Sequence, residues 1–147
     1  MSRHVIQEKL IHEVCCGAAV FNDNDEILIV RDKWDNIGLP KGQIDSTDTS
    51  SFFCAQREVQ EETNIRFKEY NFFHTHYEEV RVRKSYSPRG KIVKHVILFS
   101  GKALNSDIQI QKDEIKEAKF VSLTEFDKLV KNNSLKRALS AILKLRG

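Results

Sequence analysis

The chain has 147 residues, of which 40% are hydrophobic and 31% are charged. This length predicts one domain over residues 1–147, with a core that needs no disulfides. No apolar run reaches the roughly 20 residues of a membrane-spanning helix. The N-terminus also lacks the apolar centre of a signal peptide. We therefore expect a cytoplasmic protein without a membrane partner, whose net charge of +3 permits an anionic ligand but does not require one.

Three cysteines, Cys15, Cys16 and Cys54, cannot form a fully paired disulfide framework. The first two are adjacent inside an apolar segment, and the CxxC spacing of zinc sites is missing. Buried, reduced thiols are the expected state.

The first elements are two β-prone runs at 13–21 and 26–31, joined by the turn formers NDND. This pattern predicts a β-hairpin. Residues 32–50 lack periodicity and carry Gly, Pro, Asp, Ser and Thr, which predicts a long loop. Loops of this length in a compact domain usually carry function.

Residues 51–63 switch to a helical period, with Phe52, Ala55, Val59 and, less regularly, Phe53 available for a core. Ser50 or Ser51 is the expected N-cap of this helix. Asn64 follows its last turn and tolerates the left-handed conformation in which many helices end.

Strands are expected next at about 70–84 and 91–104, separated by the turn-forming segment SYSPRG. A short strand, KFVSL, follows an acidic patch. Two helices then begin at Thr124 and Ser134, the second with an apolar stripe made by Leu135, Leu139, Ile142 and Leu145. The element order predicts an α/β fold in which helices cover a mixed sheet.

The helix at 51–63 carries three carboxylates, Glu58, Glu61 and Glu62, at spacings of three and four residues. Such spacings place them on one face, where like charges repel. A divalent cation with oxygen ligands would reverse that penalty. Arg57 lies four residues before Glu61 and can pair with it. A solvated acidic face remains the alternative interpretation.

The loop before this helix contains LPKGQID, in which Gly42 allows the backbone to approach a ligand closely. Its carbonyl oxygen could complete a metal shell. A glycine loop that leads into a helix lined with carboxylates is typical of a site for metal-bridged phosphates.

Residues 42–65, GQIDSTDTSSFFCAQREVQEETNI, resemble the Nudix box, whose pattern is GX5EX7REUXEEXGU with U aliphatic. The preceding LPKG is also typical of that family. A long signature with several fixed charges is far more specific than a glycine pattern alone. The resemblance implies the Nudix α/β/α sandwich, with a mixed sheet between helices.

Two positions depart from the pattern. Arg57 lies fifteen positions after Gly42 instead of fourteen, so the first Glu of the pattern falls on Thr49 and Asp48 is the displaced candidate carboxylate. Asn64 replaces the final Gly, which is a mild change because Asn tolerates the same backbone conformation.

The resemblance implies hydrolysis of a nucleoside diphosphate linked to another group, with Mg²⁺ or Mn²⁺ as cofactor. It makes Glu58 and Glu62 the leading metal ligands, with Glu61 sharing that role or held by Arg57, and with the carbonyl of Gly42 or its neighbour in reach. The base would be Glu58 or a carboxylate from a distant loop, for which Glu114 is the candidate. An ordinary exposed acid at position 114 is the alternative.

A basic stripe from Arg81 to His95 carries six Lys and Arg residues and no acid. It could hold a polyphosphate, an inositol pyrophosphate or RNA, or it could protect the edge of the sheet from aggregation. Candidate substrate-binding residues are Lys41, Arg83, Lys84 and Tyr77. Trp34, in the loop before LPKG, is either a base platform or a loop anchor.

Within the family, the chain looks most like asymmetric diadenosine tetraphosphate hydrolases, which implies conversion of diadenosine tetraphosphate to ATP and AMP. Diphosphoinositol polyphosphate phosphohydrolases and messenger-RNA decapping enzymes are the alternative enzymes. A module that binds nucleotide or RNA without hydrolysis ranks lower, because such modules often lose the glutamates that this box retains. We expect RNA to be possible but not favoured as a partner, because a chain of this length has no room for an accessory RNA-binding domain, and the oligomeric state is open.

Overall fold

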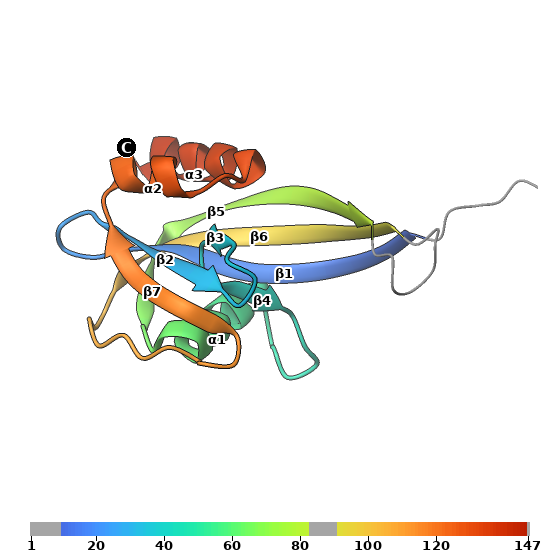
Figure 1. Cartoon of the computed structure of the whole chain (residues 1–147), viewed down its shortest axis with the longest axis horizontal. Helices are drawn as coiled ribbons and strands as arrows, with labels where there is room; N and C mark the ends of the chain where they lie inside the picture. Colours follow the sequence, from blue (N-terminus) through green and yellow to red (C-terminus); the bar gives the residue numbers. More distant parts are fainter. Residues whose placement is uncertain (1–9, 83–90, 147) are drawn as a thin grey trace, which may run out of the picture.

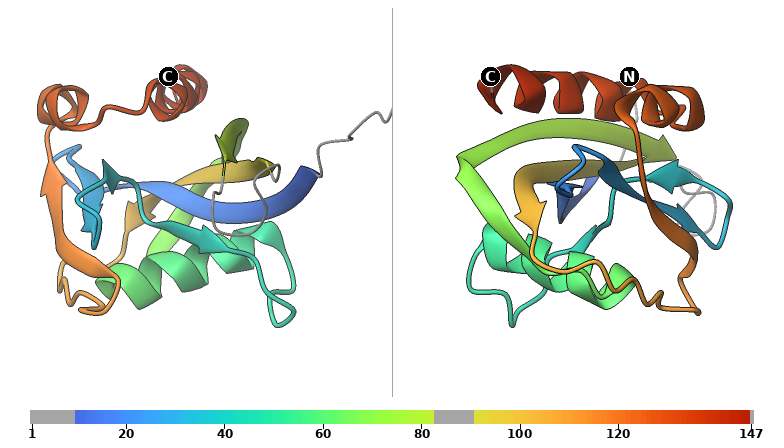
Figure 2. Two further views of the ribbon diagram at one scale, coloured as in Figure 1. Left: turned by 45° about the vertical axis from the view of Figure 1, so that its right-hand side comes forward. Right: turned by 90° about the vertical axis from the view of Figure 1, so that its left-hand side faces the viewer.

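The computed structural model describes residues 10–82 and 91–146 of the chain. Seven strands form one sheet, and helices cover both of its faces: α1 lies on one side, α2 and α3 on the other (Figures 1 and 2). This arrangement confirms the expected α/β/α sandwich. The elements are β1 (Leu10–Phe21), β2 (Ile27–Asp32), β3 (Ile37–Gly38), β4 (Lys41–Gln43), α1 (Ser51–Thr63), β5 (Phe67–Val82), β6 (Lys91–Ala103), β7 (Ile115–Val121), α2 (Leu123–Leu129) and α3 (Asn133–Arg146).

The sheet is mixed, as the sequence predicts. Its main order is β3-β2-β1-β6-β5, and β1 and β6 run parallel along the whole length of β1. The expected hairpin forms, but β2 pairs with β1 only where Phe21 faces Ile27. Further along β1, the short strand β4 takes the place of β2, so the predicted long loop contains two short strands, β3 and β4.

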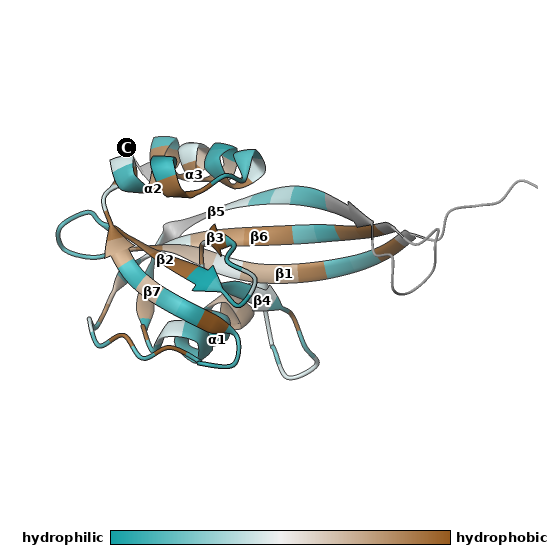
Figure 3. Cartoon of the chain, in the orientation of Figure 1, coloured by the Kyte–Doolittle hydropathy of each residue, from teal (hydrophilic) through white to brown (hydrophobic). Residues whose placement is uncertain are grey.

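Two hydrophobic clusters hold the layers together. One lies between the sheet and the pair α2–α3, and the other lies between the sheet and α1. Figure 3 shows the hydrophobic residues concentrated on β2 and β6 and hydrophilic residues on the turn between β1 and β2. In that turn, the Asn22 carboxamide oxygen accepts hydrogen bonds from the N–H groups of Asn24 and Glu26, each at 3.0 Å.

Helix α1 begins and ends where its local signals predict. The Ser50 hydroxyl accepts a hydrogen bond from the Phe53 N–H at 3.0 Å, which satisfies one free donor of the first turn. Asn64 adopts a left-handed conformation with φ of 64° and donates its N–H to the Gln60 carbonyl at 2.8 Å. The Asn in place of the family's Gly is thus accommodated.

Some sequence expectations about helix faces are wrong. The apolar stripe of α3 is buried at Leu135, Leu139 and Ile142, but Leu145 is 54% exposed in the last turn. Phe53 on α1 is 43% exposed, whereas Phe52 packs against the cluster under α1. The cysteines are free and buried, as expected.

Candidate active site

A cavity of about 680 Å³ lies where the predicted loop, α1, β5, β6 and the segment between α2 and α3 meet. Two of the three glutamates of the 51–63 helix, Glu58 and Glu62, line it. Glu114, which lies much later in the sequence, lines it as well. We call this hollow the active-site cavity. Its size lies within the range of ordinary small-molecule sites, about 300–1,000 Å³.

Glu62 is the most deeply buried of these carboxylates, with 7% of its surface exposed. Its Oε1 atom accepts a hydrogen bond from the Lys41 N–H at 3.1 Å. Burial disfavours the charged form and raises the pKa of Glu62 to about 8. A buried carboxylate that lines a cavity fits a divalent cation, because the cation offsets the cost of burying its charge.

Gly42 lies directly against Glu58. A Cβ atom at position 42 would overlap the Glu58 carboxylate, so this position needs glycine for space. The Gly42 carbonyl oxygen lies 3.8 Å from the Cys54 sulfur. Burial raises the pKa of Glu58, while the neighbouring Arg57 guanidinium opposes that shift. The hydrogen bond from Arg57 holds the Glu58 carboxylate at the edge of the cavity, in the space that Gly42 leaves open.

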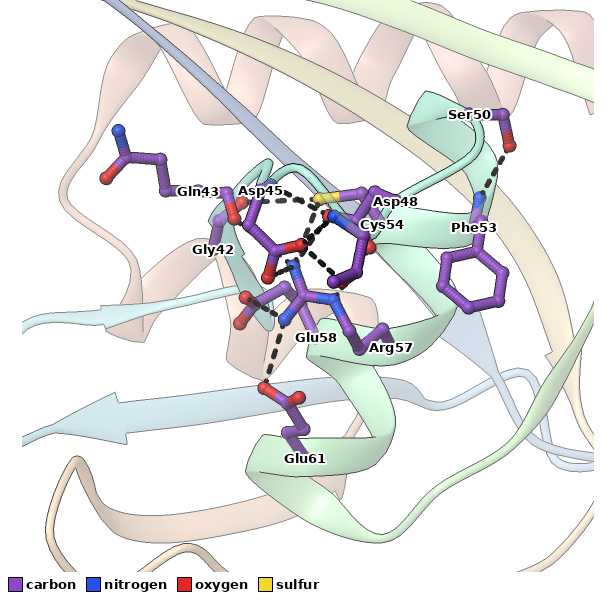
Figure 4. A network of polar contacts seen from close by, with 11 residues as sticks. Gly42, Gln43, Asp45, Asp48, Ser50, Phe53, Cys54, Arg57, Glu58 and Glu61 are labelled. Carbon is purple, nitrogen blue, oxygen red and sulfur yellow. Dashed lines mark hydrogen bonds and ion pairs between the residues drawn. The ribbon is translucent and has the colours of Figure 1, made fainter.

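Arg57 organises the start of α1 through several acids (Figure 4). Its Nε and one Nη atom bind the two carboxylate oxygens of Asp48, each at 2.8 Å, and the other Nη atom binds Glu58 at 2.8 Å and Glu61 at 3.2 Å. The Asp48 side chain is fully buried, and its pairing with Arg57 holds its pKa well below the usual range. Asp48, the carboxylate displaced by the extra loop residue, is therefore the acid that positions Arg57.

Glu61 shares one nitrogen of the Arg57 guanidinium with Glu58 but does not line the active-site cavity. Its side chain is 50% exposed and lines a second hollow, beside Phe53 and Leu104, instead of the active-site cavity. Within residues 10–82 and 91–146, the ligand atoms of the three glutamates do not gather within 4.8 Å of one another. Arg57 binds Glu61 at 3.2 Å, which is the pairing that the sequence offered as the alternative to a metal-ligand role.

Glu114 reaches the cavity from the turn before β7, although 52 residues separate it from Glu62. Its carboxylate lies 3.4 Å from the Lys33 ammonium, and its carbonyl accepts the Lys33 N–H at 3.0 Å. The sequence hypothesis placed Glu114 near the site, and the structure brings it there. Its role stays a prediction.

Of the predicted substrate-binding residues, Lys41 and Tyr77 line the active-site cavity. Arg83 and Lys84 lie outside the described residues. Lys94, a member of the basic stripe, also lines the cavity. Trp34 lines the cavity too, with 71% of its surface exposed.

Sequence reasoning missed a group of cavity residues from the segment that joins α2 to α3, which includes Lys131 and Asn132. The Asn132 side chain donates to the Glu79 carboxylate at 2.6 Å and accepts the Leu135 N–H at 3.1 Å. A helix-capping Asn was readable from the sequence. Its proximity to β5 was not, because it depends on how α3 packs on the sheet.

The family model described as "NUDIX domain" matches residues 12–141. The chain belongs to the NUDIX family. It is accordingly a Nudix pyrophosphohydrolase by family. No curated protein sequence matches the chain.

Solved Nudix structures share the fold at low identity. An Ap4A hydrolase of C. elegans, in a binary complex, is 20% identical over 90% of this chain and 98% of its own, with a TM-score of 0.66. A MutT protein of Methanosarcina mazei Go1 is 19% identical over 96% of both chains, with a TM-score of 0.62. A bifunctional NMN adenylyltransferase/ADP ribose pyrophosphatase of Francisella tularensis is 24% identical to this chain, with a TM-score of 0.66. The match covers 92% of this chain and 42% of that longer protein.

Among the residues that the structure describes, none of the helices is long and apolar enough to cross a membrane.

Proposed function

We propose that this Nudix hydrolase uses Mg²⁺, or Mn²⁺, to convert diadenosine tetraphosphate to ATP and AMP. The observation that carries the proposal is the lining of one cavity by two helix carboxylates, Glu58 and Glu62, by lysines and by an exposed tryptophan. The likeness to the C. elegans Ap4A hydrolase supports the same substrate class.

The donor set fits a hard divalent cation. Glu58 and Glu62 project from successive turns of α1 into the cavity, and carboxylate oxygens are the ligands that Mg²⁺ prefers. We propose these two as its ligands, with the Gly42 carbonyl and Glu61 as further candidates. When bound, the cation would neutralise phosphate oxygens and help to activate water.

The protein side chains supply binding and proton transfer. Lys41, Lys94 and Lys131 line the cavity and would hold phosphate oxygens of a polyphosphate chain. Trp34 would stack on one adenine, since base–aromatic stacking needs an exposed ring.

A carboxylate would take a proton from the attacking water, whose oxygen bonds to one phosphorus while the bridging oxygen leaves with the other product. Glu58 and Glu114 are the candidates, because both line the cavity. Arg57 acts one step away from the substrate by positioning Glu58, which it binds at 2.8 Å.

Purified protein with Mg²⁺ tests the proposal on a panel of diadenosine tetraphosphate, ADP-ribose, NADH, capped RNA and inositol pyrophosphates, with products separated by chromatography. ATP plus AMP from the first substrate, at the highest kcat/KM of the panel, is the expected result. A higher kcat/KM for another member of the panel would refute diadenosine tetraphosphate as the substrate. Tight binding without turnover of any member would refute hydrolysis.

A further inference from the structure

A second group of ligand-type side chains lies outside the active-site cavity. Within residues 10–82 and 91–146, the group of three whose possible ligand atoms all lie within 4.8 Å of one another is His76, Glu78 and His95. We call it the histidine group. Its three members are absent from the cavity lining.

Strand register brings these residues together. Glu78 of β5 lies directly opposite His95 of β6, and His76 lies two residues away on β5. Side chains two residues apart on a strand share a face of the sheet. On β1, Val14 faces His95, and His12 lies two residues before it on that same face. The register thus aligns three imidazoles and one carboxylate across β1, β6 and β5, strands that lie side by side in Figure 1.

The contacts within the group are short. The His95 Nδ1 atom lies 3.2 Å from the Glu78 Oε1 atom. Two ligands of a tetrahedral zinc ion, each about 2.0–2.1 Å from the metal, lie about 3.3 Å apart. The rings of His76 and His95 are stacked, with centroids 5.6 Å apart and planes 7° from parallel. The possible ligand atoms of all three residues lie within 4.8 Å of one another, so rotation of the exposed His76 side chain can bring its nitrogen to the third position.

His12 completes the arrangement from the other side of His95. Its Nδ1 atom lies 3.0 Å from the His95 Nε2 atom. Histidines that bind a metal through one ring nitrogen usually donate the other N–H to an acceptor, which fixes the tautomer. His12 is the acceptor that would leave His95 Nδ1 free for a metal.

We propose that His76, Glu78 and His95 bind a divalent transition-metal ion of the zinc class, with His12 as a positioning residue for His95. Imidazole nitrogens with one carboxylate select such ions over Mg²⁺. Three protein ligands leave a further position for water. The ion would link β5, the last strand in the order of the sheet, to its neighbour β6.

Zinc titration of the tag-free, chelator-treated protein tests this site, in excess Mg²⁺ so that the cavity carboxylates are occupied. We expect one zinc ion per chain and zinc-dependent shifts of the His76 and His95 ring signals in NMR spectra. The double variant His76→Gln/His95→Gln should bind zinc at least about tenfold more weakly, and His12→Gln should weaken binding by a smaller factor.

Glu62→Gln is the matched control, because it alters the cavity and not the histidine group. It should retain the zinc affinity of the wild type. Circular dichroism and Mg²⁺-dependent hydrolysis by the double variant check that it folds. Unchanged zinc affinity in the double variant, or ring signals of His76 and His95 that do not move, would overturn the proposal.

Discussion

The active-site cavity and the histidine group present two different ways of gathering ligands on one sheet. In the cavity, Glu58 and Glu62 come from one helix, where a spacing of four residues places them on successive turns. In the histidine group, His95 and Glu78 come from different strands and meet through register. The first arrangement offers oxygen ligands, whereas the second offers mainly nitrogen. Variants that damage one region should therefore spare the other.

The largest expected effect comes from Gly42→Ala. Its Cβ would overlap the Glu58 carboxylate, which Arg57 also holds, so Glu58 must move. We expect kcat to fall by about 100-fold or more, the range for loss of one group that acts on the transition state. Zinc affinity should not change.

Gly38→Ala is the matched control for that variant. Gly38 lines the same cavity, but its Cβ would lie 3.6 Å from the Leu135 side chain, an ordinary contact. Steady-state kinetics of both variants check the expectation. Equal activity of Gly42→Ala and Gly38→Ala would show that the position of Glu58 is unimportant.

Asp48→Asn should have the next largest effect, because it removes the charge that holds Arg57. We expect an activity loss of about 10- to 100-fold, as for groups that orient a catalytic residue. The pKa of Asp48 is lowered in the folded state, so its contribution to stability is present above its unfolded value and lost as the pH falls through the folded one. The variant should therefore lose stability at neutral pH, measured as Tm, and lose less on acidification.

Asp45→Asn is the comparison for Asp48→Asn. Asp45 lies 3.5 Å from Arg57 but its side chain is 51% exposed, and exposed pairs contribute little. If both variants had the same Tm and activity, the buried position of Asp48 would not matter.

Trp34→Ala tests the role of Trp34 in substrate binding, apart from the chemical step. Loss of one stacking partner should raise KM for diadenosine tetraphosphate about tenfold with little change in kcat. Phe53→Ala removes another exposed aromatic ring, outside the cavity, and should leave KM unchanged. An unchanged KM in Trp34→Ala would make the tryptophan a loop residue without a role in binding.

The metal-free protein should also show a pH dependence of its stability. The pKa of Glu62 rises from an ordinary 4.5 to about 8 on folding, so the stability linked to its protonation is present below the ordinary value and is lost as the pH rises toward 8. The Tm of chelator-treated wild type should fall between about pH 5 and pH 8. In Glu62→Gln, the Tm should fall less over this pH range. Curves of Tm against pH that run parallel for the wild type and Glu62→Gln would contradict the raised pKa of Glu62.

Features that depend on neighbouring residues could be predicted from the sequence, whereas features that depend on strand register or packing could not. The caps at Ser50 and Asn64 and the limits of α1 depend on neighbouring residues, and they were predicted correctly. The Nudix signature likewise indicated the α/β/α fold. The pairing of Arg57 with Glu61 also follows from local spacing, and it is observed at 3.2 Å. That Glu61 lines a different hollow from Glu58 and Glu62 could not be predicted, because the hollow that a carboxylate lines depends on the segments packed around α1.

The histidine group had no sequence signal, since 17 residues separate Glu78 from His95 and 83 separate His12 from His95. Their proximity follows from the pairing of β5 and β1 with β6. The position of Lys131 in the cavity lining could not be predicted for a similar reason, because it depends on how α2 and α3 pack on the sheet.

The central claim is that hydrolysis depends on the carboxylates of the active-site cavity. Its most direct test is the kcat of Glu62→Gln for diadenosine tetraphosphate at saturating Mg²⁺, beside Asp113→Asn, an exposed acid that does not line the cavity. We predict a loss of about 100-fold or more for Glu62→Gln and wild-type activity for Asp113→Asn. Wild-type activity in a folded Glu62→Gln protein would contradict the claim.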